Sequence, residues 1–207
     1  MSETIIYGFG PDGICTCEEA SAKNAWRGAM AIWKILEKKY LPPYRPRYVP
    51  ASVPDNEINE YLGFEPTRVS GANMDAMNAI WHLFIIDSVS ITDKIVLGTT
   101  FDNVLVRRED IPKVIEAFEA FDKEHDGMTN LKEQADGLRA FYEDEDVSAV
   151  GWNQTSVNGD DWSNAGDTIL DEDGAEIGSP YNYKTGKKHW WLFDELEKPP
   201  EDRNETE

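Results

Sequence analysis

The stretch DKIVLGTTFDNVLVRREDIPKVIEAFEAF, residues 93–121, decides the fold that we expect. It contains two short apolar runs, 95–97 and 104–106, separated by Gly, Asp and Asn, which commonly interrupt strands. Apolar side chains then recur with the 3.6-residue period of a helix. These helical positions are Ile111, Val114, Ile115, Phe118 and Phe121. The stretch therefore predicts two strands followed by a helix.

The chain before this stretch predicts a hairpin and two more helices. Apolar runs at 4–9 and 14–17 flank the turn sequence GPDG and predict two paired strands. A broad apolar face over residues 18–40 predicts the longest helix, which ends before two consecutive prolines. A second helical apolar set follows Asn73. Each of these helices needs a sheet or another helix to cover its apolar face.

The chain after this stretch predicts one more helix, a buried strand and a series of turns. Residues 131–142 have helical periodicity, and residues 147–152 form an apolar run typical of a buried strand. Two turn sequences, DEDG at 171–174 and KTGK at 184–187, lie between short apolar runs. We therefore expect two successive hairpins that form an acidic C-terminal β-meander.

Together these elements predict an α+β fold with a mostly antiparallel sheet. Three main helices, at 18–40, 111–121 and 131–142, are expected to pack on one side of it. The length suits a single domain, which we place at residues 1–194. The polar residues 195–207 are expected to form a disordered acidic tail.

Charge is the unusual property of this sequence. Its 207 residues include 40 acidic and 20 basic side chains, for a formal net charge of −20. Residues 1–100 carry 12 acids and 9 bases, whereas residues 101–207 carry 28 acids and 11 bases. Such a charge repels nucleic-acid phosphate and anionic membranes and attracts basic proteins. We therefore expect no direct nucleic-acid or membrane binding. With no signal-like apolar run, a cytoplasmic protein is expected.

The sequence predicts no catalytic residue, metal site or cofactor. It contains no phosphate-binding glycine loop and no nucleophile motif. Cys15 and Cys17 have no second pair nearby, and the three histidines are scattered. A calcium loop starting at Asp161 would place Ala165 where a ligand is required. Forty acidic residues make accidental carboxylate pairs common, so such pairs carry no signal.

The segment most typical of a ligand site follows the strand predicted at 147–152. It combines amide, hydroxyl and carboxylate side chains with two tryptophans, which predicts an alternative ligand pocket or enzymatic site. The residues of this pocket would be Trp152, Asn153, Gln154, Thr155, Asn158, Asp161 and Trp162. A turn-rich loop that satisfies its own backbone gives the same composition.

A second candidate surface is the sequence YRPRYVP at residues 44–50, which combines basic and aromatic side chains in an extended segment. It is either a rigid connector or a docking strip for an acidic or aromatic partner.

Acidic residues provide the leading functional hypothesis. Four of them, at 143–146, end the helix predicted at 131–142, where the helix dipole disfavours negative charge. We expect a non-enzymatic acidic protein of the inhibitor or immunity type, as found in phages and mobile elements. It would mimic nucleic-acid charge to block a basic nuclease or another nucleic-acid-handling protein. An acidic structural or assembly subunit is a third possibility. The expected contact residues are Glu143, Asp144, Glu145, Asp146, Asp160, Asp161, Asp167, Asp171, Glu172, Asp173 and Glu176.

Overall fold

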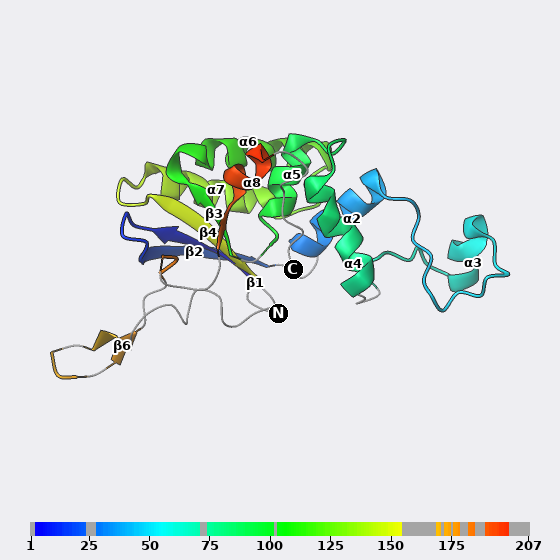
Figure 1. Ribbon diagram of the computed structural model, residues 1–207, viewed down its shortest axis with the longest axis horizontal. Helices are drawn as coiled ribbons and strands as arrows, with labels where there is room; N and C mark the ends of the chain where they lie inside the picture. The colour runs from blue at the N-terminus through cyan, green and yellow to red at the C-terminus, as the bar shows by residue number, and fades with distance from the viewer. Residues whose placement is uncertain are drawn as a thin grey trace.

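The computed structural model shows a mixed α/β fold with seven α-helices and a five-stranded sheet in its described residues (Figure 1). The structure describes residues 3–23, 28–70, 74–101, 103–154, 169–170, 172–174, 176–178, 182–184 and 189–198. Among these, no helix combines the length and the apolar character that crossing a membrane requires.

The strands of the central sheet follow the order β2-β1-β4-β3-β7. Strands β1 (Glu3–Phe9) and β2 (Cys15–Lys23) form the predicted hairpin. Strand β4 (Ala149–Gln154) lies antiparallel between β1 and β3 (Val104–Arg107). Strand β7 (Trp190–Trp191) pairs with β3 in parallel at the edge. The sheet is therefore mixed, because its last strand enters beside β3 in the same direction.

Figure 1 shows the helices α5, α6, α7 and α8 on one side of the sheet, with α2 and α4 beside them. Residues alternate between the two faces of β3, as a strand requires. Val104 and Val106 belong to the core on the helical side, whereas Leu105 packs with Phe9 and Tyr183 on the other. The bounds of these helices are Ala29–Tyr40 for α2, Met74–Trp81 for α4, Ile91–Gly98 for α5, Ile111–Glu124 for α6, Leu131–Glu143 for α7 and Leu192–Glu197 for α8.

The prediction of a strand at 95–97 is wrong, since these residues belong to α5. Ser90 begins this helix, and its Oγ accepts a hydrogen bond from the backbone N of Asp93 at 3.1 Å. All three residues of the run are buried. Residues 93–98 of α5 are all buried, so no exposed polar face marks this part of the sequence as helical. Its short apolar run then has the composition of a buried strand.

The helix predicted at 18–40 begins eleven residues later than expected, at Ala29. Residues up to Lys23 instead continue β2, where Glu18 pairs with Tyr7 and Lys23 pairs with Glu3. Pairing with β1 provides hydrogen-bond partners for the backbone groups of these residues, which a helix would otherwise pair within itself. Strand β2 therefore continues to Lys23, where the sequence predicts a helix. The predicted helices at 111–121 and 131–142 are confirmed as α6 and α7.

The C-terminal region differs from the predicted meander. Residues 172–174 of the predicted acidic turn do lie between two antiparallel strands, β5 (Ile169–Leu170) and β6 (Glu176–Gly178). The second predicted hairpin is wrong, because β7 pairs with β3 and helix α8 begins directly after it. Helix α8 ends at Glu197, so the first three residues of the predicted tail are helical. Residues 199–207 lie outside the described residues.

Residues 41–70 form an arm that extends away from the helical layer, at the right of Figure 1. The arm contains the 3-10 helix η1 (Asp55–Glu57) and the short helix α3 (Ile58–Leu62). Helix α3 ends at Gly63, whose positive φ of 73° is the left-handed conformation that commonly terminates helices. The arm leaves from the C-terminal end of α2 and includes the predicted docking strip at 44–50.

Candidate protein-binding surface

The acidic turn, residues 143–146, connects α7 to β4 and exposes all four of its acidic residues. Asp144 Oδ1 accepts a hydrogen bond from the backbone N of Asp146 at 2.9 Å. The backbone N of Val147 donates to the carbonyl of Asp144 at 3.3 Å. These two hydrogen bonds close the chain into a compact turn, so the four acidic residues lie in one exposed turn of the backbone.

Arg108 compensates for the acidic end of α7. It lies in the 3-10 helix η3 (Arg108–Asp110), and its guanidinium donates hydrogen bonds to the carbonyls of Tyr142, Asp144 and Val147. The guanidinium also lies 5.7 Å from the centroid of the Tyr142 ring. A cation at a helix C-terminus interacts favourably with the helix dipole and satisfies carbonyls that have no partner within the helix. Arg108 therefore makes the acidic turn compatible with a stable helix end.

The acidic turn adjoins the helices α6 and α7, which pack side by side. Residues 108–146 contain 13 acidic and 5 basic residues. Arg139 forms ion pairs with Glu119 on α6 and Asp136 on α7, and Lys113 pairs with Asp110 at 2.7 Å. Three of the five bases in this region are thus paired with acids or directed at backbone carbonyls, and acids outnumber bases on the helix pair.

The other predicted contact residues are not placed beside the acidic turn. Glu172 and Asp173 are exposed at the turn between β5 and β6, and Figure 1 shows this hairpin apart from the helical layer. For Glu176 the structure describes the backbone in β6. Four further acids of the prediction lie outside the described residues: Asp160, Asp161, Asp167 and Asp171. The structure therefore brings together the residues 143–146 of the predicted set.

Trp152, the first residue predicted for the alternative ligand pocket, is fully buried in the core on the helical side of the sheet. Its Nε1 donates a hydrogen bond to Gln134 Oε1 at 3.0 Å, and its ring packs edge-on against Phe118. Asn153 and Gln154 continue β4, where they pair with β1. The remaining residues predicted for this pocket lie outside the described residues: Thr155, Asn158, Asp161 and Trp162.

Sequence reasoning missed a buried polar network where α2, α5 and α6 meet. Asp93 Oδ2 accepts hydrogen bonds from Tyr40 Oη at 2.5 Å and Ser90 Oγ at 2.8 Å, and lies 2.9 Å from Lys39 Nζ. Burial alone would lower the pKa of Lys39, but hydrogen bonds to Glu124 and Asp93 outweigh this and raise that pKa. The spacing of Ser90 and Asp93 is the capping pattern that could have revealed this helix start. Asp93 is inaccessible to solvent, so we assign the network to the packing of the three helices.

The described parts of the chain hold no group of three or more His, Cys, Asp or Glu side chains that could coordinate a metal ion. No protein-family model, curated protein or solved structure matches this chain.

Proposed function

We propose that this chain is a non-enzymatic acidic binding protein of the inhibitor or immunity type. Its target is a basic protein that handles nucleic acid, such as a nuclease. The carboxylates of the acidic turn would lie where the phosphates of the nucleic acid otherwise bind. The observation that carries this proposal is the acidic turn, whose four exposed acids are clustered beside the negative surface of α6 and α7.

The architecture of the turn favours binding. Arg108 and the backbone hydrogen bonds hold the turn in one conformation before any partner arrives. A preformed surface loses little conformational entropy on association. The surrounding negative charge accelerates encounter with a basic target, and salt reduces this acceleration because it screens the charges. The proposal therefore predicts fast, salt-sensitive association.

The proposal is tested by reversing charge at the acidic turn. The variant carries Glu143→Lys and Glu145→Lys, which leave the carboxylate of Asp144 and its hydrogen bond in place. The matched control carries Glu60→Lys and Asp87→Lys, two exposed acids outside α6 and α7, and has the same net charge. A third variant with Glu172→Lys and Asp173→Lys measures the contribution of the β5–β6 hairpin separately.

Tagged wild-type protein captures partners from a cell lysate at low salt, and a rising salt gradient elutes them. We expect a basic nucleic-acid-handling protein whose binding is competed by duplex DNA. Glu143 and Glu145 are each expected to form one charge pair with the target, worth at least about 1.5 kcal/mol. Reversing both charges should therefore weaken the purified complex about 100-fold or more. The control variant should retain its affinity, and all variants should keep nearly the wild-type melting temperature.

Two outcomes would contradict the proposal. One is that the lysate provides no basic partner at low salt. The other is that the variant with reversed charge at residues 143 and 145 binds the captured protein as tightly as the wild type does.

A further inference from the structure

The arm, residues 41–70, presents several exposed aromatic side chains. Three of the seven large hydrophobic residues that are exposed in the described parts of the chain lie in it. They are Tyr48, Tyr61 and Phe64, which are 68%, 56% and 52% exposed. Single exposed apolar residues are ordinary on a protein surface, but a group of them indicates an interaction site.

The arm is anchored to the body of the protein by a buried ion pair. Glu37 of α2 accepts hydrogen bonds from the backbone N of Arg68 at 2.9 Å and from Arg68 Nη1 at 3.0 Å. Both side chains are largely buried, at 7% and 12% exposed. Within the arm, Arg45 donates to the carbonyls of Pro50 at 2.7 Å and Val53 at 2.9 Å. These contacts hold the exposed aromatic residues in a defined arrangement.

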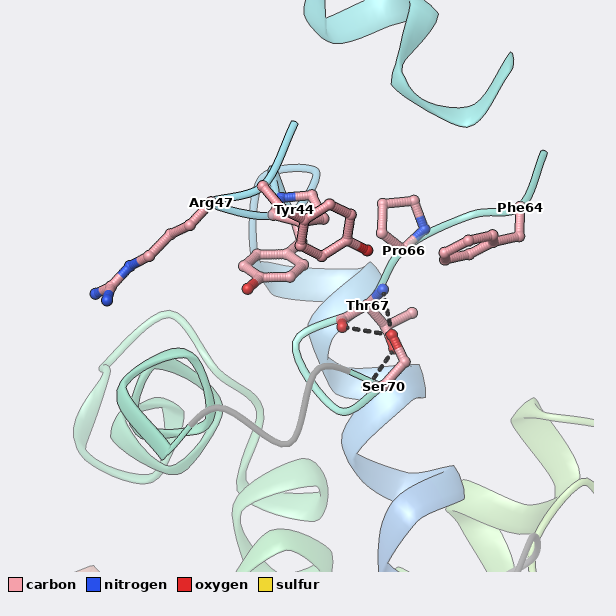
Figure 2. Close-up of a pocket in the computed structure, with 8 residues that line it drawn as sticks. Tyr44, Arg47, Phe64, Pro66, Thr67 and Ser70 are labelled. Atoms are coloured by element: carbon pink, nitrogen blue, oxygen red, sulfur yellow. Dashed lines mark hydrogen bonds between the residues drawn. The ribbon is translucent and has the colours of Figure 1, made fainter. Parts of the chain in front are cut away.

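A pocket of about 200 Å³ is lined by two of these exposed residues, Tyr48 and Phe64 (Figure 2). Its walls include Tyr44, Tyr48 and Phe64 together with two prolines, Pro46 and Pro66. Figure 2 shows a turn at one side of the pocket, where hydrogen bonds join Thr67 and Ser70. The pocket is therefore mostly apolar and aromatic, and its lining comes from two segments of the arm.

Arg47 is the single charged residue among those that line this pocket. Its side chain is 81% exposed, and Figure 2 shows it extending outward from one end of the row formed by Tyr44, Pro66 and Phe64. It pairs with Asp75 at 3.2 Å, but that carboxylate is 73% exposed, and such surface pairs contribute little. The guanidinium can therefore exchange this contact for a carboxylate of a bound partner at little cost.

Aromatic grooves bind extended proline-containing segments well, because such segments already have the bound conformation and lose little entropy. A positive charge at the end of the groove then favours an acidic residue next to the proline. We propose that this pocket binds an extended, proline-containing acidic segment of a partner protein. The inference is independent of the function proposed above, because it concerns a different surface and a partner segment of the opposite charge.

The pocket is tested by selecting phage-displayed random 12-residue peptides on the intact wild-type protein. We expect the selected peptides to be enriched in proline next to Asp or Glu. Fluorescence anisotropy of labelled selected peptides should show at least a tenfold weaker Kd for a variant carrying Tyr48→Ala and Phe64→Ala. The matched control is Tyr61→Ala, which removes an exposed aromatic residue of the same arm that does not line the pocket.

Arg47→Glu tests the charge requirement. This variant should bind the acidic peptides at least tenfold more weakly, and it should bind analogues with lysine in place of the acid more tightly than the wild type does. All substituted side chains are exposed, so circular dichroism and melting temperature should match the wild type.

The inference is overturned by selected peptides that lack the proline and acid enrichment, or by equal losses for Tyr61→Ala and the pocket variant. It is also overturned if light scattering shows that the pocket residues instead join two copies of this chain.

Discussion

Replacing Trp152 by phenylalanine tests whether this residue belongs to the core or to a ligand site. In the structure its indole is fully buried, packs against Phe118 and donates a hydrogen bond to Gln134 Oε1. Gln134 is itself buried and donates from Nε2 to Asn130 Oδ1 at 2.9 Å. The substitution therefore removes apolar contacts and leaves a buried amide oxygen without its donor.

The expected loss of stability has two parts. The missing part of the indole costs about 1–2 kcal/mol in lost burial and packing. The unsatisfied oxygen of Gln134 adds about 1–3 kcal/mol. We therefore expect Trp152→Phe to lower the free energy of unfolding by about 3 kcal/mol. For a chain of this length, that loss corresponds to a melting temperature about 6–12 °C lower.

Urea denaturation monitored by circular dichroism measures this loss. A double-mutant cycle with Gln134→Met separates the hydrogen bond from the packing, because Met has nearly the shape of Gln without its polar atoms. The two substitutions together should cost about 1 kcal/mol less than the sum of the single ones. A cost below about 0.5 kcal/mol for Trp152→Phe would refute the reasoning, because that is the effect of a surface substitution.

Two further predictions concern the packing and the ion pair of α8. A Cβ atom at Gly98 would lie 2.4 Å from Leu192 Cδ1 and 3.1 Å from Phe84 Cε2, so Gly98→Ala should lower the free energy of unfolding by about 1–3 kcal/mol in urea denaturation. Hydrogen bonds from Arg107 lower the pKa of Asp194 below its ordinary value of 3.8. The contribution of this pair is therefore present above that pH and is lost as the pH falls through the lower folded-state pKa. Asp194→Asn should flatten the loss of stability below about pH 4 in acid unfolding followed by circular dichroism; an unchanged profile would contradict this role.

The sequence by itself determined two kinds of element. Helices α6 and α7 have one face in the core and one face exposed, so the 3.6-residue period of their apolar residues reports their geometry. Strands β1, β3 and β4 follow from short apolar runs, because they are buried on both faces of the sheet. The four consecutive acids at residues 143–146 could also be identified, because the charge of a segment follows directly from its residues.

Tertiary structure decided the elements for which local pattern is ambiguous. Residues 93–98 of helix α5 are all buried, so this helix lacks the exposed polar face that distinguishes a helix from a strand. Strand β2 is extended by pairing with β1, and β7 is defined by pairing with β3, more than 80 positions earlier in the chain. Strand pairing is a contact between distant segments, and local periodicity carries no information about its partner.

The same distinction applies to both candidate surfaces. The sequence shows four consecutive acids, but Arg108, which holds their turn, comes from a segment more than 30 residues earlier. It also shows the predicted docking strip at 44–50, but Phe64 and Pro66 complete the pocket only when the arm folds back on itself. The sequence determined the chemical character of each surface, whereas its geometry depends on contacts between segments that only the folded chain brings together.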